Sequence, residues 1–376
     1  MFTATEYQQR ITDLQAGLKR ENLDAMLVTT DPNLTYLTGV SVFSMERPVV
    51  MVIPAEGQTR LVLPRMEQEP LSESLTVDHH DVYWELDAKT GRGWIEAVQE
   101  AIGSAHRVGV DPFAELSVTT ALGDCTWQIC SLVEDLRVIK SPAEIALTRR
   151  VASYWTQSMN NILQSVSAGV SVGELMAVGG KISNAVFENE PQANWINTKV
   201  AQFFQCAPMS GSPHHLSYRA DEVLPQGPSI INAVGAICHY NAENERTVLT
   251  GNYTPQHAEL FDIMQQGQQM ALNMIKPGVR CADVDCAVQD FFEKEGVGEH
   301  QRHRVGHGFG LLPHERPYTS EGSKEVYQPN MIISVEPGLY VDGVGGFRHS
   351  DTVLITEGGI ENFSAGTPKD RASLTF

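Results

Sequence analysis

Apolar residues in the first part of the chain switch between helical and strand spacing. Tyr7, Ile11, Leu14 and Leu18 recur every three to four residues, which predicts a helix over residues 5–22. Shorter apolar runs predict strands at 24–30, 47–53, 59–64 and 107–111, a turn at 31–33 and a helix over 90–105. This alternation predicts an α/β layer domain over residues 1–140.

A helix-start signal marks the second domain. Ser141 precedes Pro142, and Glu144 follows three residues after Ser141, the pattern of a capping box. Apolar residues at near four-residue spacing continue this helix to about residue 166. We therefore expect a second domain over residues 141–376. Segments 169–175 and 278–284 each combine a Gly-Val turn with the start of a new helix, which suggests two duplicated halves.

Charge and composition narrow the class of protein. The 376 residues contain 27 Lys+Arg and 46 Asp+Glu, a formal net charge of −19, which argues against a nucleic-acid partner. No apolar run is long enough to span a membrane, and the start of the chain has no apolar signal segment. The six cysteines include no C-x-x-C pair and indicate reduced thiols. We expect a soluble, cytoplasmic protein.

Carboxylates stand where the second domain is predicted to form strands. Residues 230–248 predict a hairpin in which Glu243 and Glu245, two residues apart, share one face. Two carboxylates on one face repel each other unless a metal, a cationic ligand or Arg246 lies between them. Glu336 interrupts an apolar strand over 331–341 and needs a partner there.

Histidines accompany these carboxylates. His214 and His215 lie in a Ser- and Gly-containing loop, and the Gly-rich segment 304–317 carries His307 and His314. In the strand predicted over 347–355, His349 and Asp351 share one face and Arg348 lies on the other. Each feature alone is common in proteins without chemistry, but together they predict one pocket lined by carboxylates and imidazoles.

The order of these segments carries a family resemblance. The chain reads IKSPAEI from Ile139, INAVGAICHYNAENERTV from Ile231, GHGFGLLPHERP from Gly306, MIISVEPGLYV from Met331 and GGFRHSDTVLIT from Gly345. It resembles over essentially its whole length the pita-bread family (peptidase family M24) of aminopeptidase P, prolidase, creatinase and ectoine hydrolase. The resemblance implies an N-terminal creatinase-type α/β domain and a C-terminal pita-bread domain with pseudo-two-fold halves.

The resemblance also implies where metals would bind. Peptidases of the family hold two divalent ions through Asp, Asp, His, Glu and Glu. The matching positions here are Asn232, Glu243, His307, Glu336 and Ser350. Because Asn232 and Ser350 remove two anionic ligands, we expect no metal cofactor. The alternative is one divalent ion such as Mn, Co or Zn.

This pattern is similar to that of the metal-independent creatinase and ectoine hydrolase branch. It implies that Glu245 and Glu336 clamp or attack a cationic C–N centre, with Glu243 nearby. One imidazole of the 214–215 pair would act as acid or base, His215 in preference to His214, which would otherwise bind substrate. The same comparison gives His307 a catalytic role, and His314 and His349 contacts with substrate. Arg47 would bind the substrate carboxylate from the partner subunit of a homodimer, with Arg316 or Arg348 as alternatives.

Three functions remain open at this point. The first is metal-independent hydrolysis of a C–N bond in a small, zwitterionic amidine or guanidine acid, creatine-like or ectoine-like. The second is an Xaa-Pro-type metallopeptidase with a degenerate metal site. The third is a non-catalytic binding protein, which the five retained residues Glu243, Glu245, His307, His314 and Glu336 argue against.

Overall fold

The chain forms two compact units, residues 1–137 and 138–376. The computed structural model describes residues 2–41, 45–71, 76–123, 125–217 and 219–376. None of the helices in this described part is long and apolar enough to cross a membrane.

The first unit is built on a mixed sheet with strand order β4-β3-β2-β1-β5-β6. Strand β1 pairs antiparallel with β2 and parallel with β5. The elements of this unit are α1 (Ala4–Arg20), β1 (Ala25–Val28), α2 (Asp31–Thr38), β2 (Val50–Pro54), β3 (Arg60–Pro64), η1 (Arg65–Glu67), α3 (Gln68–Leu71), β4 (His79–Tyr83), α4 (Trp94–Ile102), β5 (Arg107–Val110), α5 (Leu116–Leu122) and β6 (Thr126–Ile129), and α6 (Leu132–Val138) follows them.

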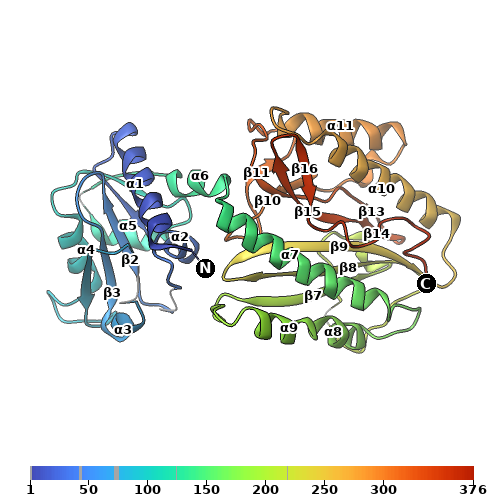
Figure 1. Cartoon of the computed structure of the whole chain (residues 1–376), viewed down its shortest axis with the longest axis horizontal. Coiled ribbons are helices and arrows are strands. Elements are labelled where there is room, and N and C mark those ends of the chain that lie inside the picture. Colours follow the sequence, from blue (N-terminus) through green and yellow to red (C-terminus); the bar gives the residue numbers. More distant parts are fainter. Residues whose placement is uncertain (1, 42–44, 72–75, 124, 218) are drawn as a thin grey trace. The chain divides into compact units, whose positions relative to one another are not determined.

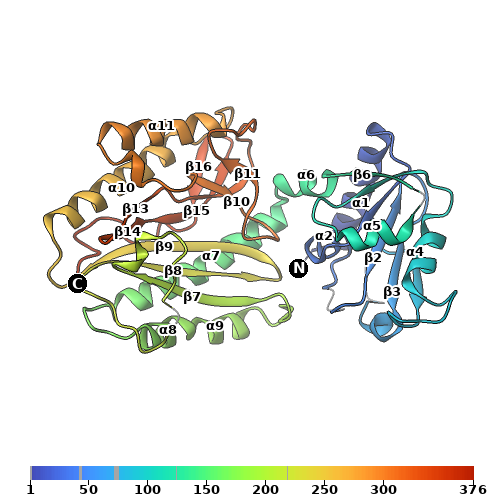
Figure 2. The same ribbon diagram turned by 180° about the vertical axis from the view of Figure 1, so that it is seen from behind.

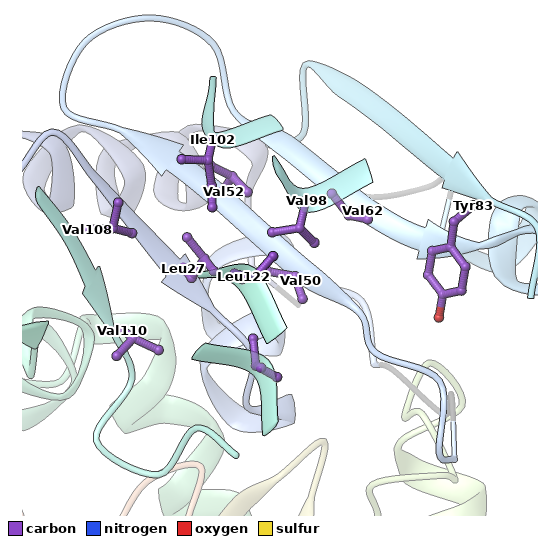
Figure 3. Packing of buried hydrophobic residues seen from close by; sticks show 11 residues of the cluster. Leu27, Val50, Val52, Val62, Tyr83, Val98, Ile102, Val108, Val110 and Leu122 are labelled. Carbon is purple, nitrogen blue, oxygen red and sulfur yellow. The ribbon is translucent and has the colours of Figure 1, made fainter. Parts of the chain in front are cut away.

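One core cluster of this unit lies between the sheet and two helices. Leu27, Val50 and Val62 from the strands pack with Val98 of α4 and Leu122 of α5 (Figure 3). Helices α1 and α2 lie on the other face of the sheet (Figures 1 and 2). Helix α2 replaces the turn predicted at 31–33, because Pro32 in a first helical turn starts a helix as readily as it makes a turn.

The second unit is built on an antiparallel sheet with order β11-β10-β12-β15-β9-β8-β7, and β16 pairs with β15. Its elements are α7 (Pro142–Leu163), α8 (Val172–Gly180), α9 (Ile182–Asn189), β7 (Lys199–Cys206), η2 (Met209–Gly211), β8 (Gly227–Ile237), β9 (Tyr240–Thr250), α10 (Pro255–Met274), α11 (Cys281–Lys294), η3 (Gly298–His300), β10 (Gly306–Gly308), β11 (Glu315–Thr319), β12 (Ile332–Val335), β13 (Gly338–Val341), β14 (Gly345–Arg348), β15 (Ser350–Thr356) and β16 (Gly359–Asn362).

Two helix pairs repeat the same local structure. The capping box of Ser141 and Glu144 starts α7, which packs across β8 and β9 and leads to α8 (Figure 1). Before α8 and before α11 a glycine with positive φ is followed by an isolated antiparallel bridge, Ser171 with Val223 and Arg280 with Val326. The predicted repeat therefore has a structural counterpart, and the predicted two-part fold is confirmed.

Two predicted strands are each broken in two. The run 331–341 forms β12 and β13 with Glu336 and Pro337 between them, and the run 347–355 forms β14 and β15 with His349 between them. The backbone N–H of Glu336 still donates to the carbonyl oxygen of Val305, just before β10, but Pro337 has no N–H with which to continue the pairing. Both breaks lie next to the cavity that holds the candidate site.

Candidate active site

Cross-strand register brings the polar residues of three strands together. Glu245 on β9 lies directly opposite Asn232 on β8 and opposite Ser350 on β15. Residues opposite each other on neighbouring strands point to the same face, so these three side chains form a polar line across the sheet. Glu243, two residues earlier on β9, lies on the same face.

This face borders a cavity of about 450 Å³. Its lining combines acidic, imidazole, guanidinium and apolar side chains. These are Phe203, Gln205, His214, Leu216, Asn232, Val234, Glu243, Glu245, His303, Arg304, Pro313, His314, Glu336 and Arg348.

Glu243, His307 and Glu336 form a group suited to one metal ion. One ligand atom from each residue lies within 4.8 Å of the others. The Nδ1 of His307 lies 3.2 Å from the carbonyl oxygen of Gly308, so we assign it the proton that it donates there. The lone pair of Nε2 then faces Glu336 Oε1 at 3.0 Å, without a hydrogen bond that satisfies it. A cation between these two atoms would relieve their repulsion.

Asn232 adds a fourth candidate ligand. Its Oδ1 is buried and has no hydrogen-bond partner among the described residues. A buried carbonyl oxygen without a partner is costly, and a bound cation satisfies it. Two carboxylates, one imidazole and one amide therefore fit a single divalent ion of the Mn, Co or Zn type.

The fifth position of the metal pattern does not fit a ligand. Ser350 Oγ donates a hydrogen bond of 2.6 Å to Glu243 Oε1, so the serine orients that carboxylate. Neither Asn232 nor Ser350 contributes the charge that a second divalent ion requires. The residues present fit one metal ion and not two.

Glu245 is held by Arg348. The guanidinium binds the carboxylate through Nε and through Nη2, the latter at 3.1 Å from Oε1, and both side chains are buried. Nη1 of Arg348 donates to the hydroxyl of Tyr340 at 2.8 Å. Since Glu245 is neutralised by this fork-like pair, Glu243 and Glu336 are the carboxylates that remain to balance an added ion.

The pKa shifts of Glu243, Glu336 and His314 reflect the burial and the neighbouring charges of this site. Burial, together with Glu336 and Glu245, raises the pKa of Glu243 well above its ordinary value. Burial alone would raise the pKa of Glu336. When Nε2 of His307 carries a proton in place of a metal ion, its hydrogen bond and charge, together with His303 and Arg348, outweigh burial and lower the pKa of that carboxyl. Burial first, and then neighbouring His307, lowers the pKa of His314 to about 4, so this imidazole is neutral at pH 7.

Glycines let β10 carry His307 into this crowded position. A Cβ on Gly306 would lie 2.2 Å from the carbonyl oxygen of Ser334, and one on Gly308 would lie 2.2 Å from that of Arg316. Only glycine allows both neighbouring backbones to approach so closely. The stacked ring of His314, 3.9 Å between centroids, then fixes the plane of His307.

The structure separates the two neighbouring histidines of the 214–215 pair. His214 lines the cavity, whereas His215 is absent from its lining. This placement favours His214 over the predicted His215 as acid or base. The chain turns here, and the His215 N–H donates to the carbonyl oxygen of Ser212.

Three other predicted site residues are absent from the lining of this cavity. Arg47, in the first unit, pairs with Glu85 at 2.7 Å, and Arg316 pairs with Glu325 at 2.9 Å. His349 is fully buried, accepts from the backbone of Thr247 and contacts the Lys369 carbonyl. The predicted contact of His349 with substrate does not fit this placement, because the ring is absent from the cavity lining and packs edge-on against Phe261.

Sequence reasoning missed two residues of the cavity wall. His303 and Arg304 line the cavity immediately before the Gly-rich stretch. His303 Nε2 lies 2.8 Å from the Tyr340 hydroxyl, which links it to Arg348. Their only sequence signal was proximity to His307, since neither lies on a strand with alternating polarity.

Family models match both units of the chain. The model of metallopeptidase family M24 matches residues 146–357, and that of the creatinase/prolidase N-terminal domain matches residues 10–139.

Curated relatives cover nearly the whole chain. A protein named probable dipeptidase PepE from Mycobacterium tuberculosis is 28% identical over 95% of this chain and 94% of its own length. A protein named Xaa-Pro dipeptidase from Pyrococcus horikoshii is 25% identical over 93% of this chain and 95% of its own. These relatives support the family but not the narrower creatinase and ectoine hydrolase branch expected from the site pattern.

Solved structures share the fold. Dipeptidase PepE from Mycobacterium ulcerans superposes with a TM-score of 0.83 at 25% identity, covering 100% of this chain and 99% of that one. Prolidase from Pyrococcus horikoshii gives a TM-score of 0.81 at 22% identity, covering 96% and 99%. With its cavity carboxylates and imidazoles set on this fold, the chain belongs to metallopeptidase family M24, as a hydrolase with a creatinase/prolidase-type N-terminal domain.

Proposed function

We propose that this protein is a single-metal peptidase that cleaves dipeptides, with Xaa-Pro as the preferred class. The observation that carries the proposal is the group of Glu243, His307 and Glu336, with two buried ligand atoms, Asn232 Oδ1 and His307 Nε2, that lack hydrogen-bond partners in the described part of the chain. A divalent ion in such a site supplies Lewis-acid polarisation of the scissile carbonyl and an activated water.

The residues of the chain have separate tasks in this proposal. Glu243, His307, Glu336 and Asn232 hold the ion. Neutral His314 offers a hydrogen bond to the substrate at pH 7. The apolar side chains of Phe203, Leu216, Val234 and Pro313 form a wall against which a pyrrolidine ring can pack. The choice of dipeptides as the substrate class follows the names of the relatives, dipeptidase and Xaa-Pro dipeptidase.

Metal-independent attack on a cationic C–N centre is less well supported. That function requires Glu245 to face the cationic substrate, but Glu245 is already bound by Arg348. A substrate cation would have to displace a buried guanidinium, at a cost of several kcal/mol.

The test compares substrates with and without metal. Protein stripped of metal and reloaded with Mn²⁺, Co²⁺ or Zn²⁺ should hydrolyse Ala-Pro, and chelation should abolish the activity. His307→Ala should lower kcat/KM by at least about a hundredfold, while the exposed-surface control Glu357→Gln should match the wild type. Hydrolysis that survives chelation, or turnover of creatine or ectoine instead, would overturn the proposal.

A further inference from the structure

His314 lies on a segment that has no regular structure of its own. Its ring stacks on that of His307 at 3.9 Å between centroids, but the residue is exposed and belongs to the stretch 310–314, which forms neither helix nor strand. A side chain on such a stretch samples many orientations unless other contacts fix the backbone that carries it. The 310–314 loop therefore needs support if His314 is to meet a substrate in one geometry.

The carboxylate of Glu315 folds back against this loop. Its Oε2 accepts a hydrogen bond from the backbone N–H of Leu312 at 3.3 Å. A Cβ on Gly310 would lie 2.1 Å from Oε1 of Glu315, so glycine leaves the room that the carboxylate occupies. Glu315 thus contacts the loop at its start and in its middle.

Lys140 holds this carboxylate from the frame of the unit. Its Nζ lies 3.0 Å from Oε1 of Glu315, and only 1% and 9% of the two side chains are exposed. The backbone N–H of Lys140 donates to the carbonyl oxygen of Asn330 at 2.9 Å, and the next residue, Ser141, is the N-cap of α7. Because a buried carboxylate is costly without its counter-charge, the position of Lys140 fixes that of Glu315.

The start of the loop is tied separately. The carbonyl oxygen of Gly310 accepts from the backbone N–H of Asn241 at 2.9 Å and from its Nδ2 at 3.0 Å. At the other end Glu315 lies opposite Gly308 in the register of β10 and β11, one residue from His307. The loop is therefore held at both ends, and the Lys140–Glu315 pair adds the contact in its middle.

We propose that Lys140 and Glu315 are positioning residues, which hold the 310–314 loop and with it the ring of His314 over His307. Neither residue of the pair lines the cavity, so the pair acts through His314 and not by touching substrate. The consequence for turnover rests on the proposed peptidase function, whereas the placement of the ring does not.

A double substitution separates this role from simple stability. Lys140→Met with Glu315→Met removes both charges and the acceptor for Leu312, while side chains of similar volume remain. Replacing a buried ion pair by apolar residues of similar size commonly keeps a protein folded. The control, Arg149→Met with Glu361→Met, removes an exposed ion pair of 2.8 Å from the same unit and should behave as the wild type.

NMR of the purified protein with labelled histidines measures the placement directly. The ring signal of His314 is identified by its loss in His314→Gln. Because the ring stacked on it displaces this signal, the double variant should move the signal toward that of an unstacked histidine, while Lys140→Arg, which keeps the charge, should leave it close to the wild type. A signal that does not move in the folded double variant would overturn the inference. If the double variant does not fold, Glu315→Gln, which weakens the tie to Lys140, takes its place under the same criterion.

Kinetics on Ala-Pro with the metal-loaded enzyme measure the consequence. The double variant should lower kcat by about 10- to 100-fold with KM within about 3-fold, since a displaced catalytic group costs this order of rate. In a His314→Gln background the same two substitutions should cost less than about 3-fold, because no ring is left to position. Equal losses in the two backgrounds would contradict a positioning role, since a purely structural effect lowers both alike.

The two measurements also separate this inference from the proposed function. If the wild type hydrolyses no dipeptide, the peptidase proposal fails, and the NMR comparison alone decides whether the Lys140–Glu315 pair places His314.

Discussion

Two neutral residues, Asn232 and Ser350, stand where the family's peptidases carry carboxylates, and Glu245 lies between them on the sheet. The carboxylate of Glu245 has its own counter-ion, Arg348. In the proposed single-metal site, Asn232 and Ser350 leave too little negative charge for a second ion, and the Glu245–Arg348 pair adds no net charge.

Asn232→Asp should strengthen metal binding. A carboxylate in place of the amide adds a negative charge to the ligand set, so the affinity for Mn²⁺ should rise roughly tenfold at neutral pH. Competition with a fluorescent chelator measures this change, and Asn273→Asp on the exposed side of α10 provides the control. An unchanged affinity would mean that Asn232 does not contact the ion.

Glu245→Gln should destabilise the fold. It leaves the buried Arg348 guanidinium without its main counter-charge, which costs about 3–5 kcal/mol in the free energy of unfolding. Urea denaturation checks this value. Combining Glu245→Gln with Arg348→Met should recover part of the loss, since both charges are then gone. If Glu245→Gln lowers the free energy of unfolding by less than about 1 kcal/mol, Glu245 is not the main counter-charge of Arg348.

Sequence patterns alone identified most of the candidate site residues but not the ion pairs that they form. Glu243, Glu336, His307 and His314 are recognisable because polar side chains interrupt apolar runs. The Glu245–Arg348 pair depends on a register between strands more than a hundred residues apart, which no local pattern specifies.

At the scale of elements, strands β9 and β15 have two different polar faces. One face carries Glu243, Glu245 and Ser350 toward the cavity. The other carries Arg246 and Asp351, which form a fully buried ion pair at 2.8 Å. Residues 364–376 pack against this second face, where Lys369 donates to Asp351 at 2.7 Å. The C-terminal segment thus supports the strands that hold the site.

Asp351→Asn should show how much the contacts of Asp351 with Arg246 and Lys369 contribute to the stability of the fold. Burial would raise the pKa of Asp351, but Arg246 and Lys369 outweigh it and hold the value at about 2. A lowered pKa means that Asp351 stabilises the fold above its ordinary value of 3.8 and that this contribution is lost as the pH falls from 3.8 toward 2. The variant should lose about 3–5 kcal/mol at pH 7.

The pH dependence provides the check. Thermal melts of wild type and variant should differ most near pH 7 and converge as the pH falls from 3.8 toward 2, while Asp290→Asn on the exposed side of α11 should follow the wild type throughout. A difference that stays constant down to pH 2 would mean that the charge of Asp351 is not what stabilises the segment.

Several elements could be predicted from periodicity or capping. The helices at α1 and α7 and the strands at β2, β3 and β5 lie close to their predicted ranges, because each has a clear apolar period or capping signal. The predictions that failed are those in which one local sequence pattern is compatible with two structures. Asp31 and Pro32 fit a turn or a helix start, and an apolar run with one carboxylate fits one strand or two.

At the scale of the whole molecule, the chain is an acidic two-unit protein with a net charge of −19. The family resemblance predicts a homodimer, and sedimentation equilibrium should return twice the chain mass of 41.4 kDa. In that prediction Arg47 serves the partner subunit, although within its own unit it pairs with Glu85. A monomer at micromolar concentration would refute the dimer and remove Arg47 from the site.

The central claim is that this M24 hydrolase holds one metal ion where the family's peptidases hold two. Elemental mass spectrometry of the purified protein, after loading with Mn²⁺, Co²⁺ or Zn²⁺ and removal of free metal, tests it most directly. The ligand set of Glu243, His307, Glu336 and Asn232 predicts one tightly held equivalent, lost in His307→Ala. Two equivalents would mean that Ser350 and Asn232 do not limit the site, and less than about a tenth of an equivalent with every metal would contradict the claim altogether.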